Sequence, residues 1–92
     1  MILIAKGSFD RDTDKIRNKN LRIALFEKLK QLEQAKDISH TTGLKLMRGY
    51  STHYRIHVNS GKLRYRIGAV IRSDKIWLVR FLTKKNIYKE FP

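Results

Sequence analysis

The sequence predicts an α+β fold in which N-terminal helices pack on a small antiparallel β-sheet and a short helix ends the chain. Apolar residues recur at helical spacing in the first half of the chain, and they alternate with polar residues in the second half. The length of 92 residues suits one domain with one modest core. We therefore expect a single domain over residues 1–92.

The N-terminal half is expected to hold one strand and two helices. The run Ile2–Ala5 is short and β-branched, which predicts an opening strand. Phe9–Ile16 is polar with one thin apolar edge and predicts a short helix. The clearest helix is Leu21–Lys36, with Asn18 or Asn20 as its N-cap. One face of this helix carries leucines at helical spacing, and we expect the sheet to cover them completely: Leu21, Leu25, Leu29 and Leu32.

The C-terminal half is expected to form a three- or four-stranded meander. After a connector rich in Ser and Thr, the period of the apolar residues changes from 3.6 to 2. The expected strands are one from Leu44 that ends at Gly49, then His53–Val58, Leu63–Ile71 and Ile76–Leu82. A short helix that carries Tyr88 is expected in the tail.

The hairpin between the two alternating strands is predicted to gather cations on one face of the sheet. Directly opposed residues of an antiparallel pair point to the same side. Pairing Val58 with Leu63 across a turn at Ser60–Gly61, or across a four-residue loop, keeps the apolar residues together. This register opposes basic residues: Arg55 with Arg66, and His57 with Arg64. Opposed like charges are destabilising, so we expect this face to bind an anion; the alternative is that the Arg side chains splay into water.

The charge of the chain predicts a polyanionic partner. Lys and Arg number 21 against 8 acidic residues, which gives a formal net charge of +13. Nucleic acid, an anionic membrane surface and an acidic protein are candidates, and an ordinary solvated basic surface is the alternative. The absence of Cys excludes disulfides and thiolate catalysis. No apolar run resembles a signal peptide or approaches the ~20 residues that span a bilayer. We therefore expect a cytoplasmic protein with no membrane partner; the alternative is a protein delivered by a route that the sequence does not show.

The basic strands carry residues suited to RNA cleavage. That reaction needs a base for the 2′-hydroxyl, cations for the phosphate and a proton donor for the leaving 5′-oxygen. His57 is the candidate base, because cationic neighbours should lower its pKa and favour the neutral form. Tyr88 is a candidate for stacking on a base or for proton transfer. Purely structural roles are the alternative for both. No carboxylate pair falls on these strands, and the three His lack a ligand spacing with acidic residues, so we expect no metal. The sequence also lacks a P-loop and a GxGxxG fingerprint, so we expect no cofactor.

Segments spread over the C-terminal half resemble the RelE/ParE superfamily of bacterial and archaeal toxins. They are Leu44–Met47 with Gly49–Tyr50, His53–Val58, Gly61–Ile67, Val79–Leu82 and Ile87–Lys89. The resemblance implies helices packed on an antiparallel sheet. RelE-like members cut mRNA in the ribosomal A site without a metal, using basic residues and often a Tyr. The resemblance also implies a cognate antitoxin, acidic or amphipathic, that wraps the toxin. If the sheet fully covers the leucine stripe, only the outer rim of the helix remains as a surface for the antitoxin.

Carried onto this sequence, the resemblance implies a catalytic set of Arg64, His57, Arg55, Tyr88 and Lys84. The C-terminal Arg of RelE-like toxins falls at Lys84 or Lys85, and the sequence does not decide between them. The expected RNA-binding set is Lys62, Arg66, Arg48, Lys85 and Lys45. His57 stands where many RelE-like proteins have Lys, and Lys replaces the C-terminal Arg, which puts the catalytic rate in doubt more than the binding.

The function implied by this resemblance is that of a type II toxin–antitoxin toxin. Such a protein would be a ribosome-dependent mRNA endoribonuclease, or mRNA interferase, that inhibits translation and is neutralised by its cognate antitoxin. Its partners would be the antitoxin, the ribosome and mRNA, with no small-molecule cofactor. Two alternatives remain open: a ParE-like inhibitor of DNA gyrase, and a non-catalytic RNA-binding module with a toxin-like fold.

Overall fold

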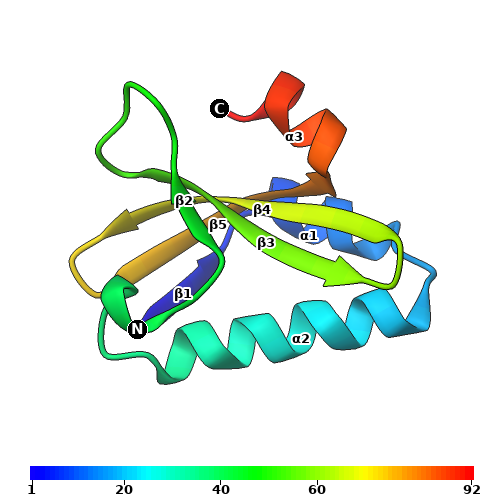
Figure 1. Ribbon diagram of the computed structural model, residues 1–92, viewed down its shortest axis with the longest axis horizontal. Coiled ribbons are helices and arrows are strands. Elements are labelled where there is room, and N and C mark those ends of the chain that lie inside the picture. Colours follow the sequence, from blue (N-terminus) through cyan, green and yellow to red (C-terminus); the bar gives the residue numbers. More distant parts are fainter.

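The structure is a computed structural model that describes the backbone of all 92 residues and every side chain except that of His40. A five-stranded sheet separates α2, which runs along one face, from α3, which lies over the other (Figure 1). The elements in chain order are β1 (Ile2–Ala5), α1 (Gly7–Asp14), α2 (Lys19–Gln34), the 3₁₀ turn η1 (Ile38–His40), β2 (Leu44–Leu46), β3 (His53–Ser60), β4 (Leu63–Arg72), β5 (Lys75–Thr83) and α3 (Lys84–Glu90). The predicted α+β fold class is confirmed. No helix in the described chain has the length and apolarity that crossing a membrane requires.

The sheet is mixed, which differs in one respect from the prediction. Its strand order is β1-β5-β4-β3-β2, and β2 to β5 form the expected antiparallel meander. The strand β1 joins the edge of β5 in parallel, with Ile2 opposite Lys75 and Ala5 opposite Leu78. The direction of a four-residue strand depends on the path of the whole chain between the paired segments, so the pattern of Ile2–Ala5 could not reveal it.

The register of the β3–β4 hairpin differs by two residues from the predicted one. Val58 pairs with Tyr65 rather than with Leu63, and the loop is Gly61–Lys62. Gly61 has φ of +57°, and a two-residue hairpin turn of type II′ places glycine at its first loop position because that position needs a positive φ. The predicted turn at Ser60–Gly61 placed the glycine at the second loop position, whereas the structure has it at the first.

The shift of two residues keeps every side chain on its predicted face, because side chains alternate with a period of two. It changes which residues are opposed. Arg55 lies opposite Gly68 and not Arg66, and His57 lies opposite Arg66 and not Arg64. The predicted opposition of two Arg side chains is therefore wrong, while the gathering of the cations on one face holds.

The helix α2 is capped and buried largely as its sequence indicates. Asn18 is the N-cap, and its Oδ1 accepts a hydrogen bond from the Leu21 N–H at 2.9 Å. Leu21, Leu25 and Leu32 are buried in the main core against the strands, whereas Leu29 is only partly buried. The sheet therefore covers most of the leucine stripe but not all of it.

A second, smaller core cluster fastens α3 to the opposite face of the sheet. It consists of Met47, Ile87 and Phe91, all buried. The ring of Phe91 lies over Gly68 so closely that a Cβ there would stand 2.6 Å from the ring. A glycine in the middle of β4 thus permits the close approach that holds α3, and with it Tyr88, in place.

Candidate nucleic-acid interface

The strands β3 and β4 place two basic side chains side by side on the face that α3 only partly covers. His57 and Arg66 are directly opposed in the hairpin. The positive charges that act on His57 come from four different elements: Arg66 on β4, Lys28 on α2, Lys84 on α3 and Lys45 on β2. Among the described side chains, no carboxylate acts on His57. We call His57 and these four residues the cation cluster.

The environment of His57 favours its neutral form. Burial is the largest cause that lowers its pKa from the ordinary value of 6.5, and the charge of Arg66 is the next, followed by those of the three lysines. The direction is the one expected from the sequence, although burial outweighs the cations. A neutral imidazole can accept a proton at neutral pH, which is the property a general base needs.

Arg66 is the most deeply buried member of the cluster, only 4% exposed. Its Nη1 donates to Asn59 Oδ1 at 3.0 Å and to the Tyr65 carbonyl at 2.7 Å. Its pKa is lowered by burial above all and by the charge of Arg64, while Tyr88 acts in the opposite direction. An Arg keeps its charge under such shifts, so Arg66 supplies a fixed positive charge beneath the surface.

A stacked pair lies beside the cluster. The guanidinium carbon of Arg55 is 4.2 Å from the centroid of the Tyr88 ring, a cation–π contact. The Nε of Arg55 is buried without a hydrogen-bond partner among the described atoms. Tyr88 is about half exposed at 49%, so the pair joins a fixed guanidinium to an aromatic side chain that solvent can reach.

The remaining predicted residues surround this centre. Arg64 is exposed on β4, opposite Asn59 and close enough to Arg66 for its charge to act there. Lys62 lies in the hairpin loop, and Arg48 lies between β2 and β3. Lys85 is exposed in the first turn of α3. Within the described part of the chain, none of Lys62, Arg48 and Lys85 has a hydrogen bond or ion pair with the cluster.

The structure distinguishes the two candidate lysines of α3. Lys84 acts electrostatically on His57, whereas no such effect of Lys85 is seen on any described group of the cluster. The helix α3 begins at Lys84 and is capped by Thr83, whose side chain accepts a hydrogen bond from the Asn86 N–H at 3.1 Å, and successive side chains of a helix point in different directions. Lys84 is therefore the lysine that belongs to the cluster.

Sequence reasoning missed two members of the site. Lys28 reaches the cluster from α2, the helix on the other side of the sheet, and no pattern in the sequence indicates this. Asn59 orients Arg66 through its side-chain oxygen, and its place near the hairpin turn gave no sign of this role. Arg66 was placed among the binding residues, but its burial and its position opposite His57 make it central.

One basic residue of the sheet is engaged elsewhere. The Nε and Nη2 of Arg80 donate to the carboxylate of Asp12 at 2.7 and 3.2 Å, and this carboxylate also accepts from the Phe81 N–H at 2.9 Å. The hydrogen bond from Arg80 to Asp12 is the main cause that raises the pKa of Arg80. Arg80 is thus a structural cation that fixes α1 to β5.

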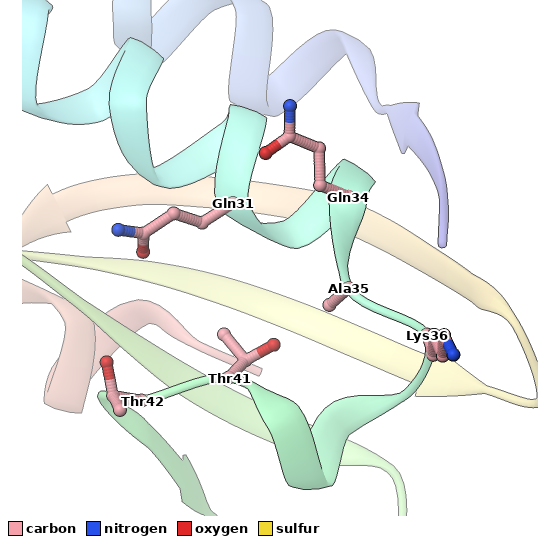
Figure 2. A pocket seen from close by; sticks show the side chains of 6 residues that line it. All are labelled: Gln31, Gln34, Ala35, Lys36, Thr41 and Thr42. Carbon is pink, nitrogen blue, oxygen red and sulfur yellow. The ribbon is translucent and has the colours of Figure 1, made fainter.

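A cavity of about 550 Å³ lies outside the cation cluster, between the end of α2 and the connector to β2 (Figure 2). It is lined by Gln31, Gln34, Ala35, Lys36, Thr41 and Thr42. Figure 2 shows the Gln31 amide on the side of the two threonines, while the Gln34 amide points away from them. The lining holds no pair of groups suited to proton transfer, so we place the candidate chemistry at the cation cluster and not here.

Comparison with known proteins supports the resemblance to RelE-like toxins. The chain is 41% identical over 49 residues to the toxin RelE3 of Methanocaldococcus jannaschii, a match that covers 53% of this chain. The match spans about half of that relative, 51% of its length. No family model matches the sequence.

Solved structures resemble the chain over nearly its whole length. The crystal structure of a RelB–RelE antitoxin–toxin complex from Methanococcus jannaschii superposes with a TM-score of 0.73 at 25% identity, covering 97% of this chain and 99% of the other. A copper-bound mutant toxin from Helicobacter pylori superposes with a TM-score of 0.63 at 15% identity, covering 94% and 97%. The second likeness is one of fold alone.

Proposed function

We propose that the protein is the toxin of a type II toxin–antitoxin system and acts in the cytoplasm as a ribosome-dependent mRNA endoribonuclease. The observation that supports this most is the convergence of cations from four elements on a His57 whose pKa is lowered. Likeness to a RelE toxin in sequence and in fold supports the same proposal. The proposed reaction uses the side chains of this chain, without a metal or a cofactor.

In the proposed reaction, neutral His57 removes the proton of a ribose 2′-hydroxyl. The 2′-oxygen forms a bond to the adjacent phosphorus, and the bond from phosphorus to the 5′-oxygen breaks, which leaves a cyclic phosphate and a 5′-hydroxyl. Arg66 and Lys84 stabilise the negative charge that develops on the phosphate oxygens. Tyr88 is the donor that returns a proton to the leaving 5′-oxygen.

The stacked pair and the rim would hold the RNA for this step. The exposed part of Tyr88 offers a surface for a base, with the Arg55 guanidinium fixed against its ring at 4.2 Å. Arg64 at the rim can bind a neighbouring phosphate with two hydrogen bonds. Lys62, Arg48, Lys45 and Lys85 would add phosphate contacts around the centre.

The proposed protein partner is an acidic cognate antitoxin. A formal net charge of +13 favours an acidic partner. The structural neighbour from Methanococcus jannaschii is a toxin in complex with its antitoxin. An antitoxin that covers the cation cluster would block access of RNA to His57.

The decisive test is translation-coupled cleavage of mRNA by the wild-type protein, Arg64→Ala and Arg72→Ala, with the 5′ ends of the fragments mapped. Arg72 is the matched control, because it lies on the same strand but at its far end, opposite Lys75. We expect discrete cuts within translated codons from the wild type and Arg72→Ala, and their loss in Arg64→Ala. Intact mRNA with the wild type would overturn the proposal, and a supercoiling assay on the same preparations would then test gyrase inhibition.

A further inference from the structure

Lys28 belongs to a helix that packs on the opposite face of the sheet, yet its ammonium group reaches the cation cluster. The Nζ of Lys28 donates to the Thr42 carbonyl at 3.2 Å. Thr42 precedes Gly43, whose carbonyl accepts from the His57 N–H at 2.8 Å. The connector into β2 therefore brings the end of the Lys28 side chain beside the strand that carries His57.

Gly43 lies between these two side chains. A Cβ at Gly43 would stand 3.5 Å from the Nζ of Lys28 and 3.5 Å from the Cβ of His57. The φ of Gly43 is +78°, a conformation in which glycine is favoured. Lys28 and His57 therefore approach the same point beside the backbone of Gly43, the one from α2 and the other from β3.

The charge of Lys28 is not balanced by the protein. Burial lowers its pKa from the ordinary value of 10.5, and its hydrogen-bond partner is a neutral carbonyl. In the described part of the chain Lys28 has no ion pair, and the charges that act on His57 together with its own, those of Arg66, Lys45 and Lys84, are all positive. A partly buried cation among other cations costs free energy, which an anion bound between them would offset.

We propose that Lys28 is a further phosphate ligand of this site and binds, from α2, the RNA backbone phosphate that lies beside His57. The proposal rests on the proposed action on RNA and adds to it a residue outside the strands and the C-terminal helix. A backbone phosphate suits this place because the ammonium groups of Lys28 and Lys45 can contact its oxygens while His57 acts on the adjoining sugar. The basic surface thereby continues around the end of β2.

The test is the salt dependence of RNA binding. A single-stranded 2′-O-methyl RNA lacks the nucleophile, so it is bound but cannot be cut. Its affinity for the wild type, Lys28→Gln, Lys28→Arg and Lys30→Gln is measured by fluorescence anisotropy over a series of salt concentrations. Lys30 is the matched control, because it is an exposed lysine of the same helix.

We expect the slope of log affinity against log salt to become shallower by about 0.7 in Lys28→Gln, the loss of one phosphate contact with a single strand. The slope should have the wild-type value in Lys28→Arg, which keeps the charge, and also in Lys30→Gln. A merely structural role of Lys28 would not follow the charge in this way.

Other results would overturn the inference in distinguishable ways. An unchanged slope in Lys28→Gln, or the same loss in Lys30→Gln, would overturn the role of Lys28 and leave the proposed function standing. A wild type that does not bind RNA would overturn both. The expected slopes in a protein that fails to cut mRNA would support Lys28 as a phosphate ligand and overturn the endoribonuclease.

Discussion

At the scale of single residues, the state of His57 decides what the cation cluster can do. Its burial and four neighbouring cations all act in the same direction on its pKa. Arg66 directly opposite is held by Asn59 and by its own chain, so its charge stays in place. The pair therefore combines a neutral acceptor of protons with a fixed cation, the combination that cleavage of RNA at its 2′-hydroxyl requires.

We predict that His57 titrates below pH 6.5 in the folded protein, because its pKa is lowered from that value. The unfolded chain then binds more protons than the folded one between the two pKa values, so the free energy of unfolding should fall as the pH falls below 6.5. The loss should be complete once the pH is below the pKa of the folded state. Proton NMR of the imidazole in the intact protein checks the midpoint.

Lys28 provides an internal control for this titration. Lys28→Gln removes one of the charges that lower the pKa of His57, so the midpoint should rise toward 6.5. Lys30→Gln should leave it unchanged. A midpoint of 6.5 or above in the wild type would contradict the assigned state of His57.

At the scale of secondary structure elements, the two short helices are held to the sheet in different ways, and one of them carries part of the site. The helix α3 brings Lys84 and Tyr88 to the strands through the small cluster of Met47, Ile87 and Phe91. At the opposite edge of the sheet, α1 continues the pairing that β1 begins. Lys6 N–H donates to the Leu78 carbonyl at 2.8 Å and Ser8 Oγ to the Val79 carbonyl at 2.5 Å. A helix thus protects the edge of β5 beyond the end of β1.

We predict that Gly68→Ala destabilises the protein by about 1–3 kcal/mol, the usual cost of overpacking a filled site. The new methyl group would stand 2.6 Å from the Phe91 ring, so α3 must shift away from the sheet. Urea unfolding measures the loss. The control is Gly7→Ala in α1, where the new Cβ meets only the flexible end of Arg11 at 3.3 Å, and no loss is expected. An equally stable Gly68→Ala would contradict the tight packing of Phe91.

We also predict that Asp12→Asn destabilises the protein by about 3 kcal/mol, the lower end of the range for removing one partner of a buried ion pair, because Arg80 is partly exposed. The variant loses the charge that binds Arg80 and weakens the hydrogen bond accepted from the Phe81 N–H. Asp10→Asn, an exposed change in the same helix, should stay within about 0.5 kcal/mol of the wild type. Equal stability of the two variants in urea unfolding would show that the ion pair does not fix α1.

At the scale of the whole molecule, a formal net charge of +13 is spread over a chain of 92 residues with a Cα radius of gyration of 12.1 Å. Such a charge opposes the compact state, because the cations repel one another. Salt screens the repulsion, and it also weakens attraction to RNA. Folding and RNA binding should therefore respond to salt in opposite directions.

We predict that the midpoint of thermal unfolding rises when NaCl is raised from about 0.01 M to about 0.15 M, which shortens the Debye length from about 30 Å to about 8 Å. A gain of about 1 kcal/mol would raise the midpoint by about 4–8 °C in a domain of this size. Circular dichroism measures the shift. A midpoint that falls as salt is added would show that attractive ion pairs outweigh the repulsion among the cations.

The sequence by itself determined the elements and the face of the sheet on which the cations gather. Helical spacing in α2, period two in β3 and β4, and the cap at Asn18 are local properties, set by steric and hydrogen-bonding preferences of neighbouring residues. The same period placed Arg55, His57, Arg64 and Arg66 on one side, and an error of two residues in the register left that result intact.

Only the tertiary structure decided the register, the parallel pairing of β1 and the membership of the cluster. The register of the β3–β4 hairpin depended on which of the two loop positions needs a positive φ. Gly61, which has a positive φ, occupies the first of these positions. Lys28 and Lys84 act on His57 from helices on opposite faces of the sheet. Arg80, by contrast, is bound by Asp12 of α1 and does not belong to the cluster. These relations join residues far apart in the chain, and they depend on packing distances that no local pattern of residues contains.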